Sequence, residues 1–313
     1  MKKIDIAKNL LISNKDMLSC PKCHSNMFIK NPYSLICQNN HCFDLSKRGY
    51  VNFLLGSVKV NYNKEMLNSR YIVSQYGFFN PIIDKITQLI RKKINTSKNS
   101  QVRILDAGCG EGYHLSSIIK NLKSGGNYNL QGIGIDISKD GISIASSHSK
   151  EIIWCVGDLA NTPYKNGQFD IITNIFSPSN YFEFNRILRD DGLVIKVVPG
   201  SNYLIELRNG FYQGEKDNYS NENVLQKFKE NFHVLYSEHI HHKTYVEKKY
   251  IKDFIKMTPL SWGSSNESIV QFLNQDSLKL SVDFIILVGI KQSKDQPENK
   301  QFLEYYKSEY HHS

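Results

Sequence analysis

The stretch ILDAGCGEGYH at residues 104–114 constrains the fold more than any other part of this 313-residue chain. An apolar run leads into three closely spaced glycines, Gly108, Gly110 and Gly112, and a helix-forming segment follows them. Glycines at such a turn let the backbone approach a bound molecule without clashes from side chains. The spacing is G-x-G-x-G and differs from the dinucleotide pattern G-x-G-x-x-G. The sequence therefore predicts a cofactor loop between a strand and a helix.

Short apolar runs alternate with helical segments after this loop. Such runs, rich in β-branched residues, occupy residues 133–136, 152–156, 169–176, 193–198 and 281–290. This alternation predicts an α/β fold in which helices cover both faces of a largely parallel sheet. The last run follows a helical segment at the end of the pattern and fits an antiparallel strand.

The region before the glycine loop divides into smaller parts. Apolar residues at helical spacing over residues 64–93 predict two helices, and Pro81 is placed to begin the second. The predicted organisation is a small cysteine-containing module at 1–60, a helical bridge at 61–100, the main α/β domain at 101–292 and a polar tail at 293–313.

A cluster of cysteines and histidines near the N-terminus predicts a metal site. Cys20, Cys23, Cys37 and His41 have the spacing C-x2-C-x13-C-x3-H. Three thiolates and an imidazole are a donor set that Zn²⁺ prefers, and four protein ligands make the site structural rather than catalytic. Cys42 competes with His41 for the fourth position. The alternative is a group of free buried thiols.

Positive charge is concentrated in the first third of the chain. The net charge is +9, and residues 1–100 hold 16 Lys and Arg against 5 Asp and Glu. Lysines that bind phosphates gain free energy by releasing condensed counterions, so this excess favours a polyanionic partner. The alternative is a solvated basic surface. Aromatic residues around the cysteines fit either base stacking or the small core of the module; they are Phe28, Tyr33, Phe43 and Tyr50.

The N-terminus does not resemble a signal peptide, because Asp5 and Lys8 interrupt its apolar residues. No segment approaches the roughly 18 apolar residues of a membrane span. The expected location is the cytoplasm, where clustered cysteines are metal ligands more often than disulfides.

Carboxylates follow the predicted strands in a regular order. Asp106 ends the strand before the glycines, Asp136 ends the second strand, and Asp158 follows the third. Together with the glycine loop, this order resembles that of the class I S-adenosylmethionine methyltransferases, which have a Rossmann-like domain. The resemblance implies that Asp136 can accept hydrogen bonds from ribose hydroxyls and that Asp158 is placed for an adenine amino group.

Further segments resemble one family among these enzymes. FDLSKRGYVNFLL at 43–55, EMLNSRYIVSQYGFFNPI at 65–82, VPGSNYLIEL at 198–207 and MTPLSW at 257–262 resemble the RlmA (RrmA) family of 23S rRNA (guanine-N1)-methyltransferases. The resemblance implies a zinc ribbon that recognises RNA, a target guanine in the hairpin loop of helix 35, and a homodimer. The Lys-, Asn- and Ile-rich composition favours the subtype associated with tylosin resistance in Gram-positive bacteria.

The resemblance also implies a set of site residues. The zinc ligands would be the three cysteines and His41 named above. The expected cofactor-binding residues are Phe79, Asp106, Gly108, Gly110, Glu111, Gly112, Tyr113, Asp136, Asp158, Asn174 and Tyr203. The sequence identifies no general base. Phe176 is a candidate for stacking on the target base, with core packing as the alternative.

Two other functions fit parts of this pattern. A small-molecule methyltransferase would use the zinc module for stability, and a non-catalytic RNA-binding regulator would keep S-adenosylmethionine as a ligand only. The basic first third argues against the former.

Overall fold

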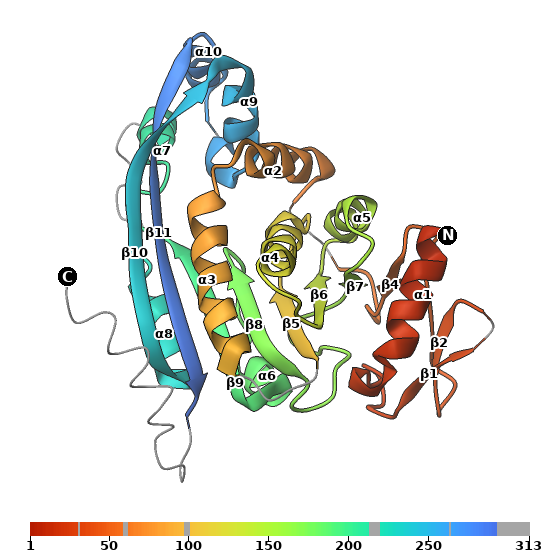
Figure 1. Cartoon of the computed structure of the whole chain (residues 1–313). Helices are drawn as coiled ribbons and strands as arrows, with labels where there is room; N and C mark the ends of the chain where they lie inside the picture. The colour runs from red at the N-terminus through yellow and green to blue at the C-terminus, as the bar shows by residue number, and fades with distance from the viewer. Residues whose placement is uncertain (31, 59–61, 97–100, 213–219, 263, 293–313) are drawn as a thin grey trace.

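The computed structural model describes residues 1–30, 32–58, 62–96, 101–212, 220–262 and 264–292 (Figure 1). The predicted polar tail lies outside these residues. A large twisted sheet runs through the molecule, with strand order β10-β11-β9-β8-β5-β6-β7-β4. The strands are β4 (Tyr50–Asn52), β5 (Val102–Ala107), β6 (Leu130–Asp136), β7 (Ile153–Val156), β8 (Phe169–Ile175), β9 (Leu188–Pro199), β10 (Phe232–Glu247) and β11 (Ser277–Lys291).

The central strands are parallel and buried on both faces. Every residue of β5, β7 and β8 is buried, as expected for strands covered by helices on each side. β11 lies antiparallel between β9 and β10, so the prediction of a final antiparallel strand is confirmed. The α/β fold class is also confirmed.

Helices cover both faces of the sheet and enclose a core on each side. One core packs α3 (Asn80–Thr96) and α4 (Tyr113–Ser124) against the sheet, and the other packs α6 (Tyr181–Ile187) and α8 (Glu222–Asn231) against the opposite face. The two helices predicted before the glycine loop are α2 (Lys64–Tyr76) and α3. Pro81 is the second residue of α3, as the pattern indicated. The remaining helices of this domain are α5 (Lys139–His148), α7 (Ile205–Tyr212), α9 (Lys248–Lys256), η2 (Pro259–Ser261) and α10 (Asn266–Leu273).

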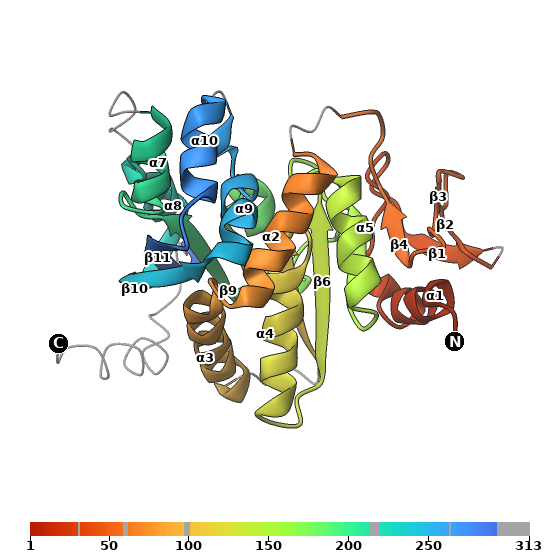
Figure 2. The ribbon, with the colours of Figure 1, turned by 90° about the horizontal axis from the view of Figure 1, so that it is seen from above.

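The N-terminal segment forms a small module beside the main sheet. It contains α1 (Lys3–Ser13), η1 (Lys15–Met17) and a three-stranded antiparallel sheet of β1 (Met27–Lys30), β2 (Ser34–Cys37) and β3 (Cys42–Asp44). The next strand, β4, leaves this module and pairs in parallel with β7 at the edge of the main sheet (Figure 1). Figure 2 shows β4 beside α5 at this edge. The two parts are therefore joined by backbone hydrogen bonds as well as by the chain. The predicted domain boundaries stay a prediction.

None of the helices in the described part of the chain combines the length and the apolar character that crossing a membrane requires.

Candidate active site and metal centre

The predicted metal ligands come together at one end of the N-terminal module. Cys20, Cys23, Cys37 and His41 each offer a ligand atom, and these atoms all lie within 4.8 Å of one another. The backbone N–H of His41 also donates to the Cys37 sulfur at 3.3 Å, which holds the second pair of ligands in a tight turn. Three thiolates and one imidazole in this grouping fit a structural Zn²⁺.

Cys42 lies outside this grouping. Its side chain is exposed, and its Sγ lies 3.6 Å from Asp44 Oδ1, away from the other cysteines. The geometry therefore favours His41 over Cys42 as the fourth ligand.

The aromatic residues of the module divide between core and surface. Phe43 and Tyr50 are buried, and the hydroxyl of Tyr33 donates to Asp5 at 2.7 Å. Phe28 is 42% exposed on β1, close in sequence to the exposed Lys22 and Lys30. Phe28 is thus the member of this set that is free to stack on a base.

The glycine turn lies between β5 and α4 and is fixed by the carboxylate at the end of β6. Gly108, Gly110 and Gly112 all have left-handed backbone angles, with φ of 79°, 54° and 78°. Asp136 accepts the backbone N–H of Gly110 at 2.8 Å and that of Ser138 at 2.7 Å. The predicted neighbours Gly110 and Asp136 therefore belong to one hydrogen-bonded unit.

Asp106 and Asn174 lie beneath this turn on adjacent strands. The hydroxyl of Thr173 donates to Asp106 at 2.8 Å, and the side-chain amide of Asn174 donates to the Ala107 carbonyl at 2.6 Å. Burial raises the pKa of Asp106 to about 7, although the Thr173 hydrogen bond opposes this rise. Both side chains are buried, so they support the turn from below.

Two buried polar atoms near the turn have no hydrogen-bond partner among the described residues. They are Oε1 of Glu111 and Nε2 of His114. Burial raises the pKa of Glu111 to about 7 and lowers that of His114 to about 3, and in both cases the charge of Arg70 on α2 is a further influence that lowers the pKa. Buried polar groups without partners are rare in proteins. S-adenosylmethionine carries an ammonium, a carboxylate and hydroxyls that can supply such partners, so the residues present fit this cofactor.

An aromatic cluster closes the site near the ends of β8 and β9. The ring of Phe176 stacks on that of Tyr203 with centroids 6.0 Å apart and lies 5.8 Å from that of Phe79. The rings of Phe79 and His114 meet edge to face at 5.0 Å. Phe176 has a φ of 52°, which is unusual for a residue with a bulky side chain and is often associated with functional sites. The structure thus brings together Phe79 and Tyr203, which are distant in sequence. Tyr113 lies at the start of α4, where its ring contacts Tyr71.

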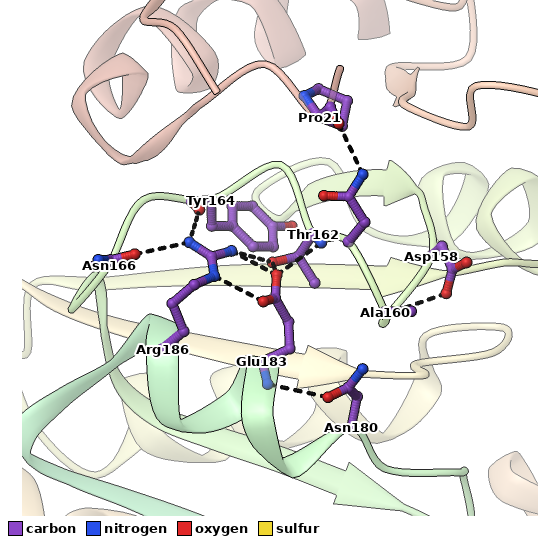
Figure 3. A network of polar contacts seen from close by, with 10 residues as sticks. Pro21, Asp158, Ala160, Thr162, Tyr164, Asn166, Asn180, Glu183 and Arg186 are labelled. Atoms are coloured by element: carbon purple, nitrogen blue, oxygen red, sulfur yellow. Dashed lines mark hydrogen bonds and ion pairs between the residues drawn. The ribbon is translucent and has the colours of Figure 1, made fainter. Parts of the chain in front are cut away.

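Asp158 lies on the loop that follows β7. It is exposed, and it accepts the backbone N–H of Ala160 at 2.8 Å (Figure 3). The side chain of Asn161 donates to the carbonyl of Pro21 in the zinc module at 2.8 Å, and the backbone N–H of Ser19 donates to Pro163 at 3.0 Å. The zinc module therefore contacts the loop that carries Asp158.

A second set of bonds holds the far end of this loop. Glu183 accepts the backbone N–H of Thr162 at 2.9 Å and its hydroxyl at 2.6 Å (Figure 3). Arg186 pairs with Glu183 and donates to the Tyr164 carbonyl at 2.7 Å. Side chains of α6 therefore hold the loop that lies between the zinc module and the main sheet.

Sequence reasoning missed three polar residues of the site. Arg70 and His114 lie within segments that were recognised, but neither was assigned a role. Lys196 lies within an apolar run and is 3% exposed. A charged residue in an otherwise apolar strand was the available signal.

The doubly wound sheet, its glycine turn and the acidic strand ends define a Rossmann-like methyltransferase, and the cysteine cluster adds a zinc ribbon. Comparison with known proteins agrees. Residues 98–255 match a methyltransferase domain, and residues 18–59 match the family model described as "RlmA, N-terminal".

Several relatives match over most of their length. One, from Bacillus subtilis, carries the name "Putative 23S rRNA (guanine-N(1)-)-methyltransferase YxjB" and is 40% identical over 278 residues, which cover 88% of this chain and 97% of the relative. The 23S rRNA (guanine(748)-N(1))-methyltransferase of Streptomyces fradiae is 23% identical over 275 residues, covering 86% and 95%. Among solved structures, the YcgJ protein of Bacillus subtilis is 18% identical, with a TM-score of 0.42 and coverage of 66% and 98%. The chain belongs to the RlmA family of 23S rRNA (guanine-N1)-methyltransferases. Its cofactors are S-adenosylmethionine and Zn²⁺.

Proposed function

We propose that this protein transfers the methyl group of S-adenosylmethionine to N1 of a guanine in 23S rRNA, within the hairpin loop of helix 35. The observation that carries the proposal is the match to the Bacillus subtilis relative, which is 40% identical and is covered over 97% of its length. The positive charge of the first hundred residues supports an RNA substrate.

The proposed cofactor site follows the glycine turn. Asp136 takes the ribose hydroxyls, since each carboxylate oxygen keeps a lone pair beyond its backbone hydrogen bond. Asp158 accepts a hydrogen bond from the adenine amino group. Glu111 pairs with the ammonium of the methionine, and Arg70 pairs with its carboxylate. The full proposed set is Phe79, Asp106, Gly108, Gly110, Glu111, Gly112, Tyr113, Asp136, Asp158, Asn174 and Tyr203, with Asp106 and Asn174 acting as support.

The bound cofactor supplies an electrophilic methyl group on a sulfonium. The protein's task is then to hold the target nitrogen in line and to exclude water. The aromatic cluster of Phe79, Phe176 and Tyr203 forms an apolar surface that excludes water at the ends of β8 and β9. Phe176 is proposed to contact the base once it is exposed from the hairpin loop.

The zinc module is proposed to bind the RNA. Zinc coordinated by Cys20, Cys23, Cys37 and His41 has no open position for chemistry and instead fixes the surface that carries Phe28. Because the module contacts the loop bearing Asp158, RNA bound there lies beside the cofactor site. We further propose a homodimer that works in the cytoplasm, where its ribosomal substrate is found. Light scattering of the purified protein would measure its oligomeric state.

The decisive experiment is methylation of 23S RNA that lacks its own modifications. The protein is incubated with labelled S-adenosylmethionine, and new methyl groups are mapped by primer extension, which stops at N1-methylguanine. A stop in the helix 35 loop is expected, and its position identifies the subtype. Absence of labelling by a protein that binds S-adenosylhomocysteine would contradict the proposal.

A further inference from the structure

The buried Lys196 of β9 lies directly under the loop that follows β8. Its Nζ donates to Asn174 Oδ1, to the Ser177 carbonyl at 2.6 Å and to Ser179 Oγ at 2.9 Å. An ammonium has three N–H donors and no acceptor, so these three partners match the charged form. A neutral amine would direct its lone pair at one of the acceptors.

The charge of this lysine is not neutralised by its hydrogen-bond partners, all of which are uncharged. Burial lowers the pKa of Lys196 to about 8, so the ammonium still predominates at neutral pH. Titratable groups on the same face of the sheet include Tyr181 of α6, Tyr164 and Cys155, and the pair formed by Asp283 and His239. Asp283 accepts from His239 Nε2 at 2.5 Å and from the Asn202 N–H at 2.7 Å, so its carboxylate is engaged elsewhere.

Three acceptor atoms at this loop already accept hydrogen bonds from within the protein. Asn174 Oδ1 accepts from Lys196 and from Ser179 Oγ, and the Pro178 carbonyl accepts from the Asn174 amide at 3.1 Å. The Ser177 carbonyl accepts from Lys196. The hydroxyl of Ser177 points from this loop toward the glycine turn. A Cβ built on Gly108 would lie only 1.9 Å from its Oγ.

A loop that offers hydrogen-bond donors rather than acceptors suits one of two classes of methyl acceptor better than the other. A neutral exocyclic amine gains positive charge as it attacks, and it is stabilised by carbonyl acceptors. A ring nitrogen that has lost its proton carries negative charge, which donors and a nearby cation stabilise. The loop after β8 offers a hydroxyl with an ammonium behind it.

We propose that Lys196 is a positioning residue that makes this site selective for deprotonated ring nitrogens over exocyclic amines, an inference that rests on the methyltransferase function proposed above. The N1 proton of guanine passes to a base in the solvent. The N1 lone pair then forms the bond to the methyl carbon as the carbon–sulfur bond breaks. The electron pair of that bond stays on sulfur, which leaves as neutral S-adenosylhomocysteine.

The test compares single-turnover methylation of 23S RNA across pH for the wild type, Lys196→Met and Lys196→Arg. In the wild type, the rate should rise with pH toward about 8 and gain nothing further above that pH, because Lys196 loses its charge there. In Lys196→Met, the pH at which the methylation rate stops rising should be higher by about one unit or more. Because one pH unit corresponds to a factor of ten, the rate at neutral pH should be at least tenfold lower than in the wild type. The difference should be smaller at high pH. Lys196→Arg should keep the wild-type position. Lys93→Met is the matched control, because Lys93 is also a buried lysine but lies on α3. This variant should keep the wild-type profile.

Binding of S-adenosylhomocysteine, measured for every variant, reports whether the fold is intact. The four outcomes separate the inference from the proposed function. N1-methylguanosine as product with a shifted Lys196→Met profile supports both, and the same product with an equal loss at every pH overturns the inference alone. Methylation of another ring nitrogen in the RNA overturns only the guanine assignment. An exocyclic methylamine as product overturns both.

Discussion

Replacing Gly112 by alanine tests how tightly the glycine turn is packed against the sheet. A Cβ at this position would lie 2.5 Å from Cη2 of Trp154 and 2.6 Å from Cβ of Ala145, and both of these side chains are buried. Gly112 also has a φ of 78°, and a left-handed alanine costs about 1–2 kcal/mol. Overpacking adds about 1–3 kcal/mol, so the free energy of unfolding should fall by about 2–5 kcal/mol.

Gly110 provides the matched comparison. Its φ is 54°, and a Cβ there would meet nothing within 4 Å, so only the backbone cost of about 1–2 kcal/mol applies. The open space beside Gly110 is where the cofactor is proposed to lie. Gly110→Ala should therefore remain folded but lose affinity for S-adenosylhomocysteine.

The assay is thermal unfolding of both variants with and without S-adenosylhomocysteine, together with calorimetric titration of the ligand. We expect Gly112→Ala to unfold at a clearly lower temperature than Gly110→Ala when no ligand is present. Gly110→Ala should lack the ligand-induced rise in Tm that the wild type shows. Equal stability of the two variants would refute the packing argument, and wild-type affinity in Gly110→Ala would refute the placement of the cofactor.

Three further predictions concern the metal, the buried acid and the loop after β9. Cys37→Ser should lose its zinc while Cys42→Ser keeps it, as measured by metal analysis of the purified variants, and retention of zinc by both would contradict the ligand set. Burial raises the pKa of Glu111 to about 7, above its usual 4.5, so its contribution to stability is fully present below about pH 4.5 and is lost as the pH rises through 7. Glu111→Gln should flatten this dependence in urea unfolding of the cofactor-free protein across that range, and an unchanged slope would refute the assignment. Asp283→Ala leaves the Asn202 N–H unpaired and should lower the free energy of unfolding by about 1–3 kcal/mol and weaken cofactor binding. The side chain of His239 is 57% exposed, so His239→Ala should lower the stability less in the same thermal assay. Equal losses in these two variants would argue against a role for Asp283 in holding the loop.

The sequence predicted the parts of the fold that have a strong local signature. The glycine turn and the apolar runs of the parallel strands are visible because buried strands are apolar throughout. The sequence favoured His41 but kept Cys42 as a competitor, because the two residues differ by only one position in their spacing to the other ligands. The structure separates them because β3 begins at Cys42, so the two side chains project in different directions.

Other elements were hidden because their burial depends on distant partners. β10 exposes one of its faces, and that face carries His239, His241 and Lys243, so its apolar pattern is weak. Its pairing with β11 over the full length of the strand is a long-range contact. The presence of Lys196 in an apolar strand was visible in the sequence, but its role was not, since its partner Asn174 precedes it by 22 residues on another strand.

The parallel pairing of β4 with β7 places a condition on how the chain folds during synthesis. Tyr50 aligns with Trp154 and Asn52 with Val156, so β4 leaves the ribosome about a hundred residues before its partner. The zinc module can bind metal in that interval, but the strand that follows it, β4, has no ladder to join until β7 has been made and has docked on β6. Completion of the sheet edge is therefore a late event, and in the meantime β4 is an exposed edge that a nascent chain must keep from pairing with other molecules.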